Sequence, residues 1–339
     1  MRMENQYVIL WDYLKNCSIG CGLDPLSDHQ INKLMKPVKF FGIGCEQPNE
    51  FIISWNLGNS CNWSCEYCPP FLNDKSVYWT DNEIIKKTLQ KIKQKITHQQ
   101  IRVEFMGGEV TLKPDFIELM QFCRELGLYT HIVTNASRTI NYWERLSPYL
   151  NSVYLTFHPQ NADKTHYEGV IDTLFNNAVT PVSHLAMVKD HFEDLVNYKK
   201  HLVEKYNNRL HVDFLLLYDK ENKRNYNGYF YDYNEDQIGF LSQHTGKHFT
   251  IEYENGERNS YSYTEVRDIN LNNFFGYTCG SRLNMLNVDY WGGASISTCA
   301  QRKRVNINTD DIERLLEPII CKQDTCNNPS DLRLYKFIA

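Results

Sequence analysis

Strand-like segments alternate with longer amphipathic, helix-like segments along the chain from residue 51 to residue 217. A strand alternates its two faces every two residues, and the fourth strand places Tyr154, Thr156 and His158 on one polar face, whereas an amphipathic helix repeats its apolar positions every three or four residues. The alternation therefore predicts an α/β fold built around a parallel sheet. Strands are expected at residues 51–57, 101–106, 130–134, 152–158, 182–188 and 210–217.

The segments between these strands carry helix start signals. Residues 80–83 (Thr-Asp-Asn-Glu) have the spacing of a capping box and precede an apolar repeat. Pro114 suits the first turn of a second helix, whose apolar face includes Cys123. Cys123 is therefore expected to pack in the core rather than to react. Further helices are expected at residues 140–149, 164–176 and 192–206.

Length, charge and termini narrow the class of protein. The 339 residues can form one large domain and a smaller one. The formal net charge is −5 and no dense basic tract is present, so we expect no nucleic-acid partner. The first ten residues lack a secretory apolar stretch, and no apolar run has the length of a membrane span. We therefore expect a cytoplasmic protein without a membrane contact.

Cys61, Cys65 and Cys68 form a C-x3-C-x2-C motif directly after the first expected strand. Three thiolates at this spacing can hold three irons of a [4Fe–4S] cluster, which leaves one iron open for another ligand. A zinc site would need a fourth cysteine or histidine nearby, and the next histidine along the chain is His98. Eleven cysteines, an odd number, also favour metal ligands over disulfides in a cytoplasmic chain.

This motif resembles that of the radical S-adenosylmethionine (SAM) enzymes, in which SAM occupies the open iron. The resemblance implies that the reduced cluster passes one electron to SAM, giving methionine and a 5′-deoxyadenosyl radical that removes hydrogen from a substrate. It also implies a partial (β/α)6 TIM barrel whose functional residues gather at the carboxyl ends of the strands. An electron donor such as flavodoxin or ferredoxin would complete the system.

Further residues match this family at the ends of the next strands. Gly107, Gly108 and Glu109 match its GGE motif, which contacts the methionine amino group of SAM. Residues 184–188, in the fifth expected strand, would supply an apolar wall for adenine. His158 is either a functional residue that faces the cavity or a structural histidine. The resemblance assigns cofactor binding to Tyr67, Gly107, Gly108, Glu109, Thr134, Asn135, Thr156 and His158.

The catalytic acid, base or hydrogen donor is not identified by the sequence. His158 and Asp213 are the candidates, and Asp213 shares a strand face with His211 by the two-residue alternation of a strand.

A second cysteine set comprises Cys279, Cys299, Cys321 and Cys326, enough for one further complete [4Fe–4S] cluster. Its order, with a strand, a glycine turn and a strand between the first two cysteines, resembles the twitch domain, a shortened relative of the SPASM domain. The C-x4-C spacing of the last pair is wider than in several relatives, and a structural zinc remains an alternative. Three earlier cysteines are interpreted as incidental thiols rather than a third metal site: Cys17, Cys21 and Cys45.

The expected organisation is an N-terminal extension (1–50), the radical SAM partial barrel (51–218), a bridging region with a hairpin turn at residues 255–256 (219–274) and a twitch-like auxiliary-cluster domain (275–339). The first functional hypothesis is hydrogen abstraction from a small polar molecule (a sugar, nucleoside or alcohol), with oxidation or epimerisation as the outcome. The second is a maturase that modifies a ribosomally made peptide by crosslinking, thioether formation or epimerisation. The third is a metal-stabilised binding protein without catalysis.

Overall fold

A computed structural model describes residues 37–42, 50–68, 73, 78–97, 100–217, 233–244, 249–262, 265–266, 271–279, 285–295, 304–307, 319–326, 332 and 336–338. The predictions made for Cys17, Cys21, Cys45 and Cys299 lie outside these residues. The chain divides into two compact units. The β/α unit comprises Pro48–Gly246 and Ser281–Glu317, and the second unit comprises Met1–Gln47, Lys247–Gly280 and Pro318–Ala339.

The predicted parallel sheet is present in the β/α unit. Six strands lie side by side in chain order, each parallel to the next, and each begins and ends within two residues of its predicted position. The prediction of an α/β fold with a parallel core is therefore confirmed. The strands are β2 (Glu50–Asn56), β3 (Gln100–Met106), β4 (Tyr129–Thr134), β5 (Ser152–Phe157), β6 (Thr180–Ala186) and β7 (His211–Leu215).

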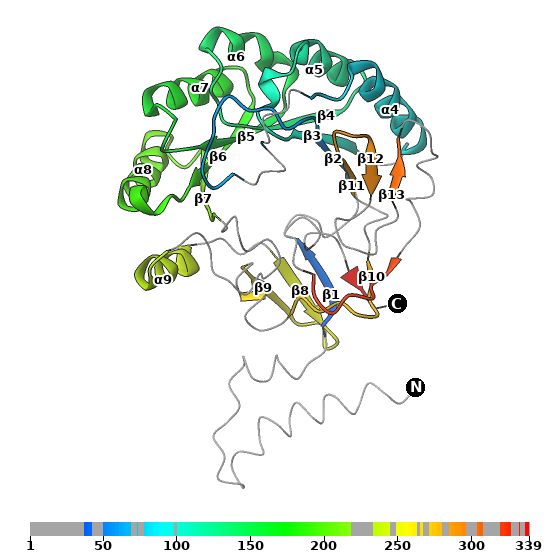
Figure 1. Ribbon diagram of the computed structural model, residues 1–339. Helices are drawn as coiled ribbons and strands as arrows, with labels where there is room; N and C mark the ends of the chain where they lie inside the picture. The colour runs from blue at the N-terminus through cyan, green and yellow to red at the C-terminus, as the bar shows by residue number, and fades with distance from the viewer. Residues whose placement is uncertain are drawn as a thin grey trace, which may run out of the picture. The chain divides into compact units, whose positions relative to one another are not determined.

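Helices cover the outer face of this sheet (Figure 1). Their aromatic side chains meet those of the strands: the ring centroids of Phe105 and Phe116 are 6.3 Å apart, and those of Phe157 and Tyr167 are 5.1 Å apart. Cys123 is fully buried in this layer, as predicted. The helices are α4 (Asn82–Lys95), α5 (Phe116–Glu125), α6 (Ile140–Leu146), α7 (Lys164–Asn176) and α8 (Phe192–Lys205), and α9 (Glu235–His244) follows β7.

The start of α4 corrects one sequence prediction. Asp81, not Thr80, is the N-cap, and its carboxylate accepts hydrogen bonds from the backbone N–H groups of Glu83 (2.8 Å) and Ile84 (3.4 Å). The Thr80 hydroxyl instead donates to the backbone carbonyls of Leu57 (3.3 Å) and Tyr290 (3.2 Å). A capping box was the wrong interpretation because this hydroxyl has tertiary partners that the local sequence does not reveal.

The sheet continues beyond β2 with strands from the C-terminal third of the chain. Strand β11 (Met285–Val288) pairs in parallel with β2, and β12 (Gly293–Ser295) and β13 (Arg304–Asn306) follow in antiparallel order. The predicted strand, glycine turn and strand are therefore a hairpin of the main sheet. The domain boundaries proposed from the sequence stay predictions; residues 281–317 group with the β/α unit.

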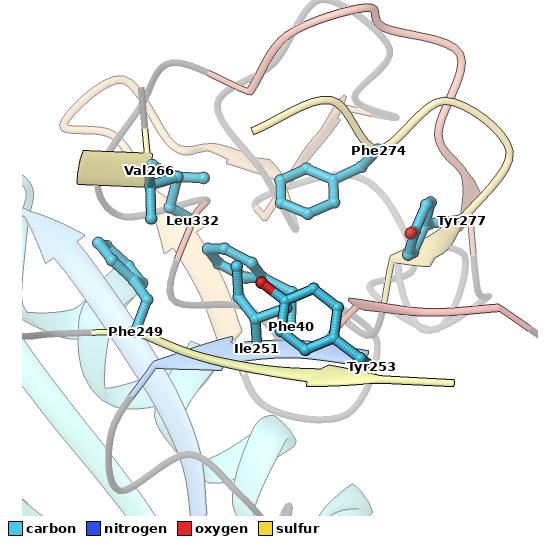
Figure 2. Close-up of a cluster of buried hydrophobic side chains, with 8 residues drawn as sticks. All are labelled: Phe40, Phe249, Ile251, Tyr253, Val266, Phe274, Tyr277 and Leu332. Atoms are coloured by element: carbon cyan, nitrogen blue, oxygen red, sulfur yellow. The ribbon is translucent and has the colours of Figure 1, made fainter. Parts of the chain in front are cut away.

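The second unit is built on an antiparallel sheet with the order β14-β10-β15-β1-β8-β9. Its core is a cluster of eight buried residues, shown in Figure 2: Phe40, Phe249, Ile251, Tyr253, Val266, Phe274, Tyr277 and Leu332. The predicted hairpin turn is confirmed, since β8 and β9 pair across it and Gly256 has φ +82°. The strands are β1 (Pro37–Gly42), β8 (Phe249–Tyr253), β9 (Arg258–Tyr261), β10 (Thr278–Cys279), β14 (Ile319–Ile320) and β15 (Lys336–Phe337). Among the described residues of either unit, no helix has the length and apolar character needed to cross a membrane.

Candidate active site

The inner face of the parallel sheet is polar, although the sheet is the core of the unit. Residues paired across parallel strands point to the same face, and register places Ser54 beside Glu104, Glu104 beside His131, and His131 beside Ser152. Two rows further along the strands, Thr156, His184 and Asp213 share the same face. We call these side chains, together with Tyr154, the inner polar face. Sequence reasoning missed Glu104 and His131; the signal was a charged residue at alternate positions of an otherwise apolar strand.

Contacts along the inner polar face are aromatic and hydrogen-bonded. His131 Nδ1 and Ser152 Oγ are 2.6 Å apart. The ring centroids of His131 and Tyr154 lie 4.1 Å apart, and those of Tyr154 and His184 lie 5.0 Å apart. Glu104 is buried and its Oε1 is 3.1 Å from Arg102 Nε. Buried groups of this kind offer hydrogen-bonding and charged partners to a polar molecule rather than an apolar pocket.

The two glycines of the GGE motif are required by the backbone that leads into the cysteine loop. Gly107 and Gly108 have φ of +101° and +41°. A Cβ on Gly107 would lie 2.4 Å from the Gly58 carbonyl oxygen, and a Cβ on Gly108 would lie 2.0 Å from the Ser60 carbonyl oxygen. No side chain can occupy either position. The backbone at the end of β3 therefore packs directly against the backbone at the start of the cysteine loop. The N–H of Glu109 also donates to the Ser60 carbonyl at 2.8 Å.

The Glu109 carboxylate is fully buried and ties the ends of β3 and β4 together. Its Oε1 accepts from the backbone N–H and hydroxyl of Thr111 (3.0 and 2.6 Å) and from the Thr134 hydroxyl (2.7 Å), and its Oε2 accepts from the Asn135 N–H (2.7 Å). Burial raises the pKa of Glu109, while these hydrogen bonds act in the opposite direction. Both oxygens are therefore engaged within the protein.

Asn135, at the end of β4, connects that strand to the cysteine loop. Its side-chain N–H2 group donates to Asn62 Oδ1 (3.0 Å) and to Cys61 Sγ (3.7 Å). Asn62 in turn donates to the Ser137 hydroxyl at 3.0 Å. The sequence did not single out Asn62, because a lone asparagine between cysteines carries no pattern.

His158, at the end of β5, lies against the cysteine loop. Its Nδ1 is 2.6 Å from the Tyr67 hydroxyl and 3.6 Å from Cys65 Sγ, and its ring is stacked on that of Tyr67 at 5.8 Å. Burial lowers the pKa of His158 to about 4, so the imidazole is neutral near pH 7. Tyr67 also packs with Ala186 and Val188, at and just beyond the end of β6, and with Leu217. These side chains form an apolar wall beside the cysteines.

The cysteine loop provides a donor set suited to an iron–sulfur cluster. Three N–H groups point at its sulfur atoms: Trp63 N–H and the Asn135 amide at Cys61, and the Asn161 amide at Cys65, the last at 3.4 Å. Three soft thiolates with N–H donors around them are the ligands and outer contacts that iron–sulfur clusters use. By donor type, the residues present suit the cluster inferred from the sequence, and its ligands stay a prediction.

Asn161→Ala should make the reduction potential of the cluster more negative. The change removes the N–H that stabilises negative charge on Cys65 Sγ, and the reduced cluster carries more of that charge. We also expect SAM cleavage to slow by up to about tenfold. Asn208→Ala, at an asparagine with positive φ elsewhere on the β/α unit, is the control. An unchanged potential in Asn161→Ala, measured by redox titration followed by EPR, would argue against a role for this hydrogen bond.

Asp213 and His211 lie on the same face of β7, as the alternation predicted. His211 Nε2 and Asp213 Oδ2 are 2.6 Å apart, and the His211 side chain is 67% exposed. Most of the other predicted site residues gather at the carboxyl ends of β2 to β5, around the cysteine loop. Thr156 lies on the inner polar face within β5, and Asp213 lies on β7, the strand at one end of the sheet.

Three of the four later cysteines belong to the second unit. Cys279 ends β10 opposite Ile319 of β14, and the Cys321 N–H donates to the Tyr277 carbonyl at 2.8 Å. The Cys326 N–H donates to the Asn272 carbonyl at 2.8 Å. Cys321 and Cys326 both pack against the buried cluster of Figure 2. Backbone hydrogen bonds thus hold the last two cysteines at the side of one core.

Comparison with known families identifies the class. The profile of the radical SAM superfamily matches residues 55–225, half of the chain, and the chain belongs to this superfamily. Its members use a [4Fe–4S] cluster and SAM, so the expected cofactors are those of the family.

Curated relatives match over short stretches. An S-adenosylmethionine-dependent nucleotide dehydratase of Fibrobacter sp. is 28% identical over 91 residues, which is 25% of this chain and 27% of the relative. A 7,8-dihydro-6-hydroxymethylpterin dimethyltransferase of Methanocaldococcus jannaschii is 32% identical over 146 residues, which is 42% of this chain and 25% of the relative. The chain thus matches about a quarter of the length of each.

A solved structure shares the fold over a longer stretch. Native anSMEcpe with bound AdoMet and Kp18Cys peptide superimposes with a TM-score of 0.53 at 20% sequence identity, and covers 79% of this chain and 80% of that chain. This likeness supports the predicted radical SAM fold.

Proposed function

We propose that this protein cleaves SAM reductively and abstracts hydrogen from a small polar substrate, with a nucleotide as the leading case. The observation that carries the proposal is the inner polar face. A sheet core lined by Glu104, His131, Tyr154 and His184 suits a substrate with hydroxyl or base groups better than an apolar one. The net reaction we propose is oxidation or epimerisation at the sugar, and loss of water is the outcome that the name of the Fibrobacter relative suggests.

The chain's own residues have separate roles in this proposal. Cys61, Cys65 and Cys68 hold the cluster. A cluster held by these three cysteines would supply the electron for reductive cleavage of SAM, and with it the radical chemistry that hydrogen abstraction needs. Because the Glu109 carboxylate is engaged internally, we propose that the backbone carbonyls around Gly107 and Gly108 receive the methionine amino group.

The remaining predicted residues shape the space around SAM. Tyr67 and the apolar wall behind it would contact adenine, and Thr134 and Asn135 would hold the strand end nearest the cysteine loop. Since His158 Nδ1 faces the Tyr67 hydroxyl, we propose that His158 positions Tyr67 rather than transferring a proton. Thr156 and Asp213 are proposed to face the substrate from the inner polar face.

The second cysteine set is proposed to bind an auxiliary [4Fe–4S] cluster through Cys279, Cys299, Cys321 and Cys326. Its support is the position of Cys279, Cys321 and Cys326 within one compact unit, on or beside paired strands. Four thiolates would leave no open iron, which favours electron transfer from a substrate radical over substrate binding. Flavodoxin or ferredoxin is the proposed electron donor to the first cluster.

The test is 5′-deoxyadenosine release from anaerobically reconstituted protein given SAM, dithionite and one of CTP, UTP or GTP. We expect release to rise with at least one nucleotide, and the mass of the nucleotide product to show loss of two hydrogens, loss of water or no change. Omitting dithionite is the control. Release that responds only to peptides would favour the maturase hypothesis instead. No release with a reduced cluster and any of these substrates would contradict catalysis.

A further inference from the structure

Three aromatic side chains cluster at the turn of the β11–β12 hairpin, and two of them are exposed. We call Tyr78, Tyr290 and Trp291 the aromatic platform. The Tyr78 and Trp291 rings are stacked, with centroids 4.7 Å apart and an angle of 29° between their planes, and the Tyr290 and Trp291 centroids are 4.8 Å apart. Trp291 is 61% exposed and Tyr78 is 39% exposed. The stack therefore holds the rings in place while much of the Trp291 surface stays in water.

The platform lies at the end of the sheet where the parallel strands have their carboxyl termini, which is also where the cofactor site is built. Because β11 runs parallel to β2, the turn after β11 stands at the carboxyl end of β2, next to the start of the cysteine loop (Figure 1). Direct contacts agree with this placement: the Thr80 hydroxyl bonds to the carbonyls of both Leu57 and Tyr290, and Gly58 pairs with Trp79.

The turn itself does not need aromatic residues. Asp289 Oδ1 accepts from the N–H groups of Trp291 (3.0 Å) and Gly293 (2.8 Å), and Gly292 supplies the positive φ of +82°. Asp and Gly at these places are sufficient to make such a turn. Two large rings between them, one of them mostly in water, contribute little burial to folding. Their preorganised faces instead suit a ligand that stacks.

We propose that the aromatic platform binds the purine or pyrimidine ring of a nucleotide substrate, with Trp291 as the stacking face. The proposal rests on the proposed function, which it narrows to nucleotides. A flat, exposed, immobilised indole matches a planar base, and such stacking depends little on which base is present.

The experiment is calorimetric titration of SAM-saturated, reconstituted protein with CTP, UTP, GTP and ribose 5-phosphate. We expect at least one nucleotide to bind and Trp291→Leu to weaken that binding about tenfold or more. Ribose 5-phosphate, which lacks a base, should bind more weakly and with equal affinity to both proteins. Phe275→Leu, at an aromatic side chain that is also 61% exposed but belongs to the second unit, is the matched control and should bind like the wild type.

Two results would overturn the inference: equal nucleotide affinity in Trp291→Leu and wild type, or no binding of any nucleotide. Quenching of tryptophan fluorescence by the nucleotide, lost in Trp291→Leu, is the second readout and does not depend on turnover. The inference and the proposed function can therefore fail separately. If SAM is cleaved but nucleotide binding does not depend on Trp291, only the role of the aromatic platform is rejected. If nucleotide binding depends on Trp291 but SAM is not cleaved, only the proposed catalysis is rejected.

Discussion

Cys65→Ala should abolish SAM cleavage in a protein that remains folded. Loss of one of three thiolates removes an iron ligand and with it the cluster through which SAM is cleaved. Cys61→Ala and Cys68→Ala should behave in the same way. The measurements are iron content and 5′-deoxyadenosine release from anaerobically reconstituted protein.

Cys123→Ala is the matched control for these variants. Its thiol is fully buried on α5, and burial raises its pKa, so it packs as a small apolar group. We expect a loss of about 1 kcal/mol in the free energy of unfolding, with SAM cleavage retained. Cys321→Ala should impair turnover or stability more than SAM cleavage. Full cleavage in Cys65→Ala, or equal loss in Cys65→Ala and a folded Cys321→Ala that retains the first cluster, would refute this division of roles.

Gly108→Ala should reduce SAM cleavage by at least tenfold and destabilise the protein by about 3 kcal/mol. A Cβ at this position would meet the Ser60 carbonyl oxygen at 2.0 Å and its carbon at 2.7 Å, so the cysteine loop must move. The displacement falls directly before Cys61 and therefore disturbs the cluster ligands. Cleavage rates and chemical denaturation of the variant measure the two effects.

Gly127→Ala separates backbone strain from displacement of the loop. Gly127 also has a positive φ (+72°), but a Cβ there would meet no atom within 4 Å. The cost should be about 1 kcal/mol of conformational strain, with SAM cleavage unchanged. If Gly108→Ala cleaves SAM as well as Gly127→Ala does, the close approach at Ser60 is not needed for activity.

The strands and helices of the β/α unit were predictable because their signals are local. Most strands from β2 to β7 have apolar residues at alternate positions, and residues 164–176 carry a helical repeat that α7 reproduces residue for residue. Cys61, Cys65 and Cys68 were recognisable by spacing alone. Gly107 and Gly108 were found by resemblance, but the reason for them, contact with the backbone at Gly58 and Ser60, required the structure.

Other features depend on contacts between distant residues. Thr80 looked like a helix cap because the sequence does not show its bond to the Tyr290 carbonyl, 210 residues away. The engagement of Glu109 by Thr134 and Asn135 depends on two strand ends meeting in space. The pairing of β11 with β2 joins segments more than 200 residues apart. Turn residues predict only pairing between strands that are close in the sequence, so this pair could not be predicted from them.

The course of the chain between the two units has a consequence for synthesis. The polypeptide enters the second unit first, builds β2 to β7, returns to the second unit and only then adds β11 beside β2. During synthesis on the ribosome, one edge of β2 therefore has no strand partner until residues 285–288 have left the ribosome. A nascent chain with an apolar open edge is a substrate for chaperones and prone to aggregation. Expression at low temperature with chaperones supplied should therefore improve the yield of folded protein more than faster synthesis does.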